Sequence, residues 1–208
     1  MEQAKHFVDE CDALAAALDH LDAPNWDTPT QFKQWTYNDV LVHLHFWNGM
    51  AHQSLLDPEA FAARLAAMSA RFQTDGMRAT ENAEMPLRGP DLKSAWQALY
   101  REMGEHWATV DPKQRVQWAG PDMSTRSSIT ARLMETWAHG QAVFDGLGLV
   151  REDSDRIRNV VILGVNTFGW TYKVNDMSMP AAMRRLFSAM ARASSSVWAS
   201  RARAAARA

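Results

Sequence analysis

Three side chains of the kinds that bind divalent metal ions stand out in this 208-residue sequence. Glu135 and His139 lie four residues apart in the run Arg132-Leu-Met-Glu-Thr-Trp-Ala-His-Gly-Gln141, and this spacing places a carboxylate and an imidazole on one helix face. His43, in Val40-Leu-Val-His-Leu-His-Phe-Trp-Asn48, is the leading candidate for a third ligand from another helix. Two His and one carboxylate suit Zn²⁺ or a similar divalent ion and leave coordination positions open for water or substrate.

The spacing alone is weak evidence. The chain has 24 acidic residues and seven His, so roughly one His should have an acidic residue four positions upstream by chance. Four pairs have this spacing: Glu2/His6, Asp39/His43, Glu102/His106 and Glu135/His139. We interpret Glu2/His6 and Glu102/His106 as exposed helix pairs. Apolar neighbours set His43 and Glu135 apart, because a buried ionisable group needs a partner and a metal ion is one.

Composition predicts one domain, or one domain with an appendage, and a full hydrophobic core, since 47% of the residues are apolar. The single cysteine, Cys11, is expected to be a small core residue of the first helix rather than a nucleophile. No run approaches 18 consecutive apolar residues, and the first residues lack the pattern of a signal peptide. We therefore expect a soluble cytoplasmic protein without a membrane span.

Charge divides the chain into a body, residues 1–176, and a basic tail rich in Ala, Ser and Arg, residues 177–208. The tail carries six Arg and no acidic residue, whereas the body holds 16 basic and 24 acidic side chains. An acidic body without a basic face makes nucleic acid an unexpected partner. For the tail, three interpretations stay open: a cationic helix that docks on the body, a disordered or surface-binding segment, and the product of an altered reading frame.

Helical periodicity dominates the first half of the body. Apolar residues from Phe7 to Leu21 recur at intervals of four and three and predict an amphipathic first helix. Thr36 is expected to cap the second helix, with Asp39 completing an imperfect capping box. That helix carries His43; His45 and His52 share another face and are interpreted as ordinary polar positions.

Asp57-Pro58 predicts the start of a shorter, Ala-rich helix that runs to about Phe72, followed by an irregular crossover from Gln73 to Arg88. A long helix is expected from Gly89 to Val110, and Ser124 or Thr125 should cap the helix that carries Glu135 and His139. Asp153 or Ser154 should cap a last helix whose apolar residues are core-like. No alternating run predicts a strand. The sequence thus predicts an all-α protein, a four-helix bundle with one short extra helix.

Three segments resemble the DinB-like metal-binding superfamily. They are Arg115-Val-Gln-Trp-Ala-Gly-Pro-Asp-Met-Ser124 with Ile129-Thr-Ala-Arg-Leu-Met-Glu-Thr-Trp-Ala-His-Gly-Gln141, and the first-ligand helix Leu41-Val-His-Leu-His-Phe-Trp-Asn48. Within the superfamily the chain looks most like the branch related to mycothiol-dependent maleylpyruvate isomerase, over roughly Ala13 to Pro180. The resemblance implies a DinB-like bundle in which the metal ligands are His43, Glu135 and His139.

The chain departs from the family pattern at two places. Ala142 stands where an acidic residue often follows His-Gly-Gln, so a partner of the metal ligands is missing or replaced. The family also often continues into a smaller C-terminal portion with β structure, whereas this chain ends in the Ala/Ser/Arg-rich segment Arg184 to Ala208.

The resemblance implies a metal- and thiol-dependent isomerase or S-transferase that uses an external small-molecule thiol. Zn²⁺ is the first expectation for the metal, with Ni²⁺, Co²⁺ or Fe²⁺ compatible with the same ligands. The expected partners are the thiol, a small-molecule substrate and a second copy of the chain in a homodimer. Two alternatives stay open: metal-assisted hydrolysis, for which Asp39 is the one general-base candidate, and a non-catalytic metal-binding module.

Overall fold

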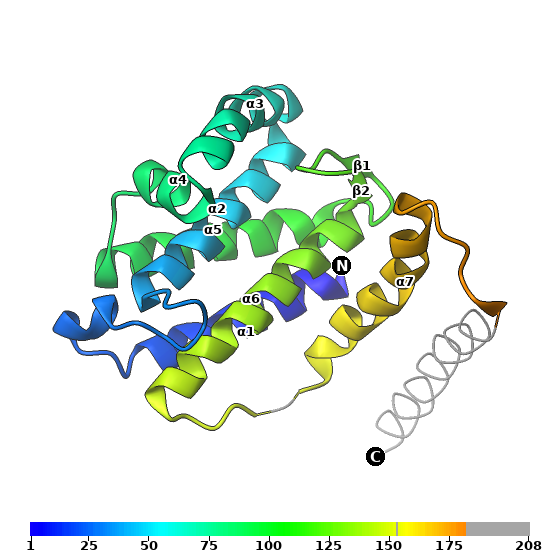
Figure 1. The fold of residues 1–208 in the computed structure, drawn as a ribbon. Helices are drawn as coiled ribbons and strands as arrows, with labels where there is room; N and C mark the ends of the chain where they lie inside the picture. The colour runs from blue at the N-terminus through cyan, green and yellow to red at the C-terminus, as the bar shows by residue number, and fades with distance from the viewer. Residues whose placement is uncertain (153, 182–208) are drawn as a thin grey trace, which may run out of the picture. The chain divides into compact units, whose positions relative to one another are not determined.

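The computed structural model describes residues 1–152 and 154–181. The chain divides into two compact units, Met1–Ile157 and Arg158–Ala208, and the site lies wholly within the first. Helices predominate in the described residues, so the expected all-α class is confirmed. Figure 1 shows the arrangement of the elements in the first unit.

Four long helices form the bundle of the first unit. They are α1 (Glu2–Leu18), α2 (Tyr37–Leu56), α5 (Gly89–Thr109) and α6 (Thr125–Leu147). The helices α5 and α6 each pack against both α1 and α2, so α1 and α2 occupy opposite corners (Figure 1). The core is aromatic and aliphatic, and its largest fully buried side chains include Phe7, Leu14, Trp96, Tyr100 and Trp107. This arrangement confirms the expected four-helix bundle.

The crossover between α2 and α5 is more regular than the sequence predicts. One extra helix was expected there, but two are present: α3 (Pro58–Thr74), capped by Asp57, and α4 (Met77–Glu84). The expected irregular stretch from Gln73 to Arg88 is therefore wrong over most of its length. Gly76, at φ +83°, separates the two helices, and a left-handed residue of this kind ends one helix and lets the next begin.

A short β-hairpin, which the sequence analysis missed, connects α5 to α6. The strand β1 (Arg115–Val116) pairs antiparallel with β2 (Met123–Ser124), and the turn between them holds Trp118. Each strand has two residues, too few for an alternating pattern to be visible in the sequence. The Ser124 hydroxyl accepts a hydrogen bond from the Ser127 backbone N–H, which confirms Ser124 as the cap of α6.

The start of α2 is fixed on several sides. Thr36 and Asp39 form a complete capping box, so the expected cap is confirmed. The other Asp39 oxygen accepts a 2.8 Å hydrogen bond from Asn82, which ties α4 to the first turn of α2. Buried Asn38 donates to Asp27 and accepts from the backbone N–H of Gly89, so it joins the same turn to the start of α5. These contacts fix the position of the helix that carries His43.

The second unit contains α7 (Arg158–Val174) in its described part. The expectation that the apolar residues of this last helix are core-like stays a prediction. The short helix η2 (Asp155–Ile157) precedes it, and Asp153 lies outside the described residues. Most of the predicted tail, residues 182–208, also lies outside them, so its three interpretations and the boundary at 176 stay predictions.

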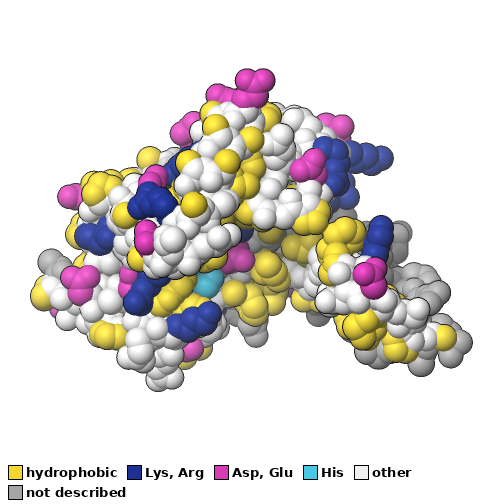
Figure 2. Space-filling view, turned by 45° about the horizontal axis from the view of Figure 1, so that its top comes forward, with side chains coloured by type: hydrophobic (Ala, Val, Ile, Leu, Met, Phe, Trp, Pro, Cys, Tyr) yellow, Lys and Arg dark blue, Asp and Glu magenta, His cyan; other side chains and the backbone are white. Residues whose placement is uncertain are grey.

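No helix within residues 1–152 or 154–181 is both long and apolar enough to cross a membrane. On the face seen in Figure 2, acidic and basic side chains are interspersed, and a histidine is visible among apolar and acidic side chains.

The close contact of α1 with α5 supplies a test of the bundle. A Cβ added at Gly104 would lie 2.4 Å from Cγ2 of Val8, a stiff β-branched side chain. We expect Gly104→Ala to lower the free energy of unfolding by about 1–3 kcal/mol through overpacking, and Val8→Ala to restore much of this loss in the double variant. Chemical denaturation of the variants measures both effects.

Gly49→Ala on α2 is the matched control. Its added Cβ would meet only Leu99 Cδ2 at 3.9 Å, an ordinary contact, and should stabilise the helix by roughly 0.5–1 kcal/mol. Equal effects of Gly104→Ala and Gly49→Ala would contradict the packing described here.

Candidate metal centre

The structure brings the three candidate ligands together. His43 comes from α2, and Glu135 and His139 come from neighbouring turns of α6. A carboxylate oxygen of Glu135, Oε2, lies 3.4 Å from His43 Nε2 and 3.1 Å from His139 Nε2. One donor atom from each residue lies within 4.8 Å of the others, which is the clustering a single cation requires.

A carboxylate behind His43 orients its ring. Glu81, 1% exposed on α4, places its two oxygens 3.0 and 3.1 Å from His43 Nδ1. The same carboxylate accepts a 2.6 Å hydrogen bond from the indole N–H of Trp47. Because a carboxylate only accepts hydrogen bonds, Nδ1 must carry a proton, so a metal ion that replaced a proton on Nε2 would be bound by a neutral imidazole. A carboxylate on the outer nitrogen is the usual partner of a metal-binding histidine.

Charge at the centre favours a cation. Burial alone would lower the pKa of His43, but hydrogen bonds to Glu135 and Glu81 outweigh it and raise that pKa above its ordinary value. Burial opposes ionisation of Glu135, yet hydrogen bonds from His139 and His43, with the nearby Arg132 charge, hold its pKa well below the usual range. Glu135 is therefore a carboxylate, and His43 lies between two acidic residues. A divalent ion can take the place of the His43 Nε2 proton.

Aromatic rings cover one side of the two histidines. The Trp35 ring stacks on His139 at 5.6 Å between centroids, and the Phe32 ring meets the same imidazole edge-on at 5.1 Å. Lys33 and Gln34 between them have φ of 50° and 56°, a left-handed backbone that is uncommon outside glycine. This turn places both rings against the donor set, and such an apolar wall limits the access of water.

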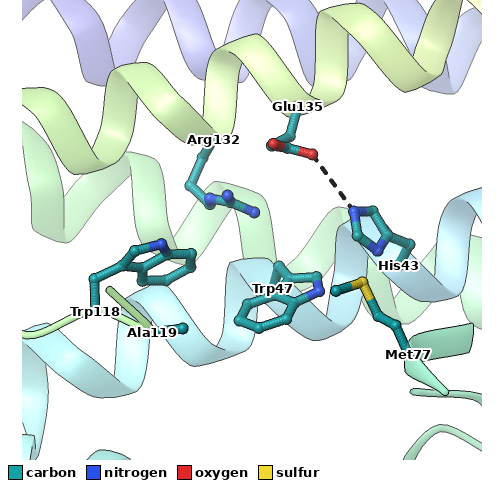
Figure 3. A pocket seen from close by; sticks show the side chains of 7 residues that line it. All are labelled: His43, Trp47, Met77, Trp118, Ala119, Arg132 and Glu135. Carbon is teal, nitrogen blue, oxygen red and sulfur yellow. Dashed lines mark hydrogen bonds and ion pairs between the residues drawn. The ribbon is translucent and has the colours of Figure 1, made fainter. Parts of the chain in front are cut away.

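A pocket opens on the other side of the donor set. Its volume is about 210 Å³, and its lining residues are His43, Trp47, Met77, Trp118, Ala119, Arg132 and Glu135. Figure 3 shows Glu135 and His43 at one end of the pocket and Trp118 at the other, with Arg132 between them. A small molecule in this pocket would contact the metal-binding side chains directly.

A second cluster also contains two His and one Glu, but the outer nitrogen of its central histidine accepts a hydrogen bond instead of donating one. His52 on α2 lies 3.4 Å from a Glu102 oxygen and 3.3 Å from His106 Nδ1, both through its Nε2. The indole N–H of Trp107 donates to His52 Nδ1 at 3.2 Å, so Nδ1 holds the lone pair and Nε2 holds the proton. The nitrogen that faces the cluster is therefore not free for a metal ion. Hydrogen bonding distinguishes two clusters that distance alone does not.

Sequence reasoning missed three residues of this region. Glu81 was overlooked because its segment was taken as irregular, although Met77 to Glu84 is rich in good helix formers. Trp118 and Arg132 stood within quoted motif segments and were given no role. Asp39, the general-base candidate, has its oxygens engaged by Thr36 and Asn82, so it serves the helix cap.

Comparison with known proteins agrees with the geometry. The family model described as the mycothiol maleylpyruvate isomerase N-terminal domain matches residues 7–144, which include all three candidate ligands and Glu81. An uncharacterized protein of Mycobacterium tuberculosis, from two strains, is 35% identical over 175 residues. That match covers 83% of this chain and 66% of the relative, so the chain spans slightly less than two thirds of the relative's length.

A solved structure has the same fold. The crystal structure of a mutant of the mycothiol-dependent maleylpyruvate isomerase aligns with a TM-score of 0.53 over 79% of this chain and 68% of that chain. Its sequence is 13% identical to this one, so the likeness concerns the fold.

The ligand assignment can be tested by metal content. We expect the purified protein to hold about one equivalent of divalent metal, and His43→Ala or the isosteric Glu135→Gln to remove it, because two donors do not retain an ion as three do. Elemental analysis of protein dialysed against buffer measures this. The matched control is His106→Ala in the second cluster, which should leave metal content unchanged. If His106→Ala alone lost the metal, the ion would be bound by the second cluster, and the assignment of the three ligands would be wrong.

The role of Glu81 can be tested by metal affinity. We expect Glu81→Ala to weaken metal binding by roughly 10–100-fold, because His43 then loses the acceptor that fixes its ring. Competition with a chromophoric chelator measures the dissociation constant. Glu84→Ala on the same helix removes an exposed carboxylate paired with Arg71 and should leave affinity unchanged. Equal affinities in the two variants would refute the role of Glu81.

Proposed function

Because the chain belongs to the mycothiol maleylpyruvate isomerase N-terminal domain family, we propose that it is a divalent-metal protein that promotes reactions of a low-molecular-weight thiol, as an isomerase or S-transferase. His43, Glu135 and His139 are the proposed ligands, with Zn²⁺ the first expectation and Ni²⁺, Co²⁺ or Fe²⁺ as alternatives. The proposal applies to the chain given, since the match covers only part of the mycobacterial relative.

One observation carries the proposal: His43 Nε2, Glu135 and His139 Nε2 converge beside an accessible pocket, and Glu81 sets the protonation of His43. Two His and one carboxylate leave at least one coordination position for an exogenous group. When bound, a divalent ion supplies a positive charge that lowers the pKa of a coordinated thiol and polarises an oxygen of the substrate.

The side chains around the site have separate tasks. Glu81 holds the His43 ring in place, and the rings of Trp35 and Phe32 exclude water from one side of the histidines. The pocket lined by Trp47 and Trp118 receives the electrophile. In the isomerase reaction the thiol adds to a polarised double bond, the resulting single bond rotates, and elimination of the thiol gives the trans isomer. In the S-transfer reaction the thiol adds in the same way but is not eliminated.

The thiol must come from outside the chain. Cys11 is fully buried in α1, and burial raises the pKa of its thiol well above the ordinary value, so the reactive thiolate is disfavoured. The Cys11 sulfur lies 3.8 Å from the hydroxyl oxygen of Thr136, the residue that follows Glu135 in the sequence. Cys11 is thus a core residue, as its sequence context predicts.

Metal-assisted hydrolysis receives less support. It needs a general base near the ion, and Asp39 is engaged in the helix cap and with Asn82. A non-catalytic metal-binding module would share the donor set and the pocket, so turnover is the property that separates it from the proposed enzyme.

The proposed function predicts thiol-dependent turnover. We expect metal-loaded protein, in the presence of mycothiol, to convert an activated cis-alkene to its trans isomer, or to consume mycothiol with an activated alkene. Absorbance and thiol titration follow the two reactions. His139→Ala should reduce either rate to the metal-free background, because the donor set is incomplete.

Cys11→Ser is the control for an internal thiol, and it should keep the full rate. Metal-loaded protein that binds its ion but shows no thiol-dependent turnover would support the non-catalytic module. Ester or amide hydrolysis without a thiol would support the hydrolase.

A further inference from the structure

One nitrogen of the Arg132 guanidinium has no hydrogen-bond acceptor among the residues that the structure describes. The residue is 4% exposed, and its Nη1 atom is buried without a hydrogen-bond partner. Among the residues that the structure describes, no carboxylate lies within 4.0 Å of this guanidinium. Its contact with the Trp118 ring, at 4.9 Å from the centroid, is a cation–π interaction, which satisfies charge but not the N–H groups.

This arrangement is costly without a ligand. Burial lowers the pKa of Arg132 to about 10, with the Glu135 charge opposing the shift, so the side chain is still cationic at neutral pH. A buried charge that lacks hydrogen bonds destabilises a fold, and an apolar side chain of similar size would often serve stability better. The simplest explanation for such a group is a bound anion that accepts its hydrogen bonds and balances its charge.

The position of Arg132 indicates where that anion would bind. Arg132 lies one helical turn before Glu135 on α6, and Figure 3 shows its guanidinium between the Trp118 ring and the Glu135 carboxylate. An anion that reaches the guanidinium therefore lies beside the metal donors. Its remaining atoms would contact the indoles of Trp47 and Trp118 and the side chain of Met77, all of which line the pocket.

We propose that this pocket binds a small monocarboxylate with a flat apolar body, and that Arg132 is the residue that selects it. This inference rests on the proposed function, which places the reaction at the end of the pocket where His43 and Glu135 lie. The guanidinium donates two parallel hydrogen bonds to the carboxylate, a geometry that a planar fork suits. The apolar body lies against the indole rings of Trp47 and Trp118, which contact each other at 5.4 Å between centroids.

Charge and size argue for this class of ligand. Among the lining residues of this pocket, all of which lie in the described part of the chain, Arg132 is the one guanidinium, and His43 and Glu135 are assigned to the metal ion, so Arg132 balances a monoanion. Phosphate, with more charge and more acceptors, would leave acceptors facing apolar rings at a cost in desolvation. A volume of about 210 Å³ is below the range of drug-sized sites, which restricts the ligand to a small molecule.

The test uses a matched pair of probes, benzoate and its neutral isostere benzamide. Both are titrated into the full chain, with and without added Zn²⁺, while intrinsic tryptophan fluorescence reports binding through Trp47 and Trp118. The variants are Arg132→Met, which removes the charge at similar volume, and Arg132→Lys, which keeps the charge without the fork. Arg126→Met, an exposed arginine on the same helix, is the control.

We expect the wild type and Arg126→Met to bind benzoate at least tenfold more tightly than benzamide. Arg132→Met should bind the two probes equally, and Arg132→Lys should fall between. Thermal unfolding should show Arg132→Met to be at least as stable as the wild type, because a buried unpaired charge is gone, and elemental analysis should show its metal content unchanged.

The inference and the proposed function fail separately. Equal binding of benzoate and benzamide by the wild type, or a benzoate preference kept by Arg132→Met, would overturn the inference whatever the metal content. Tighter binding of inorganic phosphate than of benzoate would overturn the carboxylate assignment. An Arg132-dependent preference in a chain that binds no metal would support the anion pocket and remove the proposed function.

Discussion

The hydrogen bond between Glu81 and His43 is the interaction on which the site depends. It joins α4 to α2, fixes the proton on Nδ1 and so directs Nε2 toward Glu135 and His139. The capping box of α2 supports it, because Asp39 also binds Asn82, the residue next to Glu81. A helix cap and a ligand orientation thus share one set of contacts, and the donor set is preorganised before any ion arrives.

Hydrogen-bond partners outside a cluster decide what the cluster can bind. Two groups of two His and one Glu lie within this bundle, and each uses one residue of α2. Glu81 accepts from the outer nitrogen of His43, whereas Trp107 donates to the outer nitrogen of His52. A metal ion can replace a proton on the inner nitrogen of His43, because the outer nitrogen stays protonated, whereas the inner nitrogen of His52 carries the one proton of a neutral ring. Proximity of ligand types is therefore a weak criterion for a metal centre, and the sense of the supporting hydrogen bond is a stronger one.

Much of the fold is predictable from sequence because the bundle helices carry long apolar repeats and strong caps, as at Thr36 and Ser124. Spacing and resemblance also select His43, Glu135 and His139. Glu81 escapes such reasoning since its link to His43 spans 38 residues and no local pattern encodes a contact between helices. The unpartnered state of Arg132 is likewise a property of packing.

Anomalous diffraction from crystals of zinc-loaded protein, recorded at the zinc edge, tests the central claim most directly. The account predicts one strong peak at about 2.0–2.2 Å from His43 Nε2, His139 Nε2 and a Glu135 oxygen, with the Glu81 carboxylate still bonded to His43 Nδ1. A peak among His52, Glu102 and His106 with none at the first cluster would contradict it. So would a zinc ion bound by His43 through Nδ1.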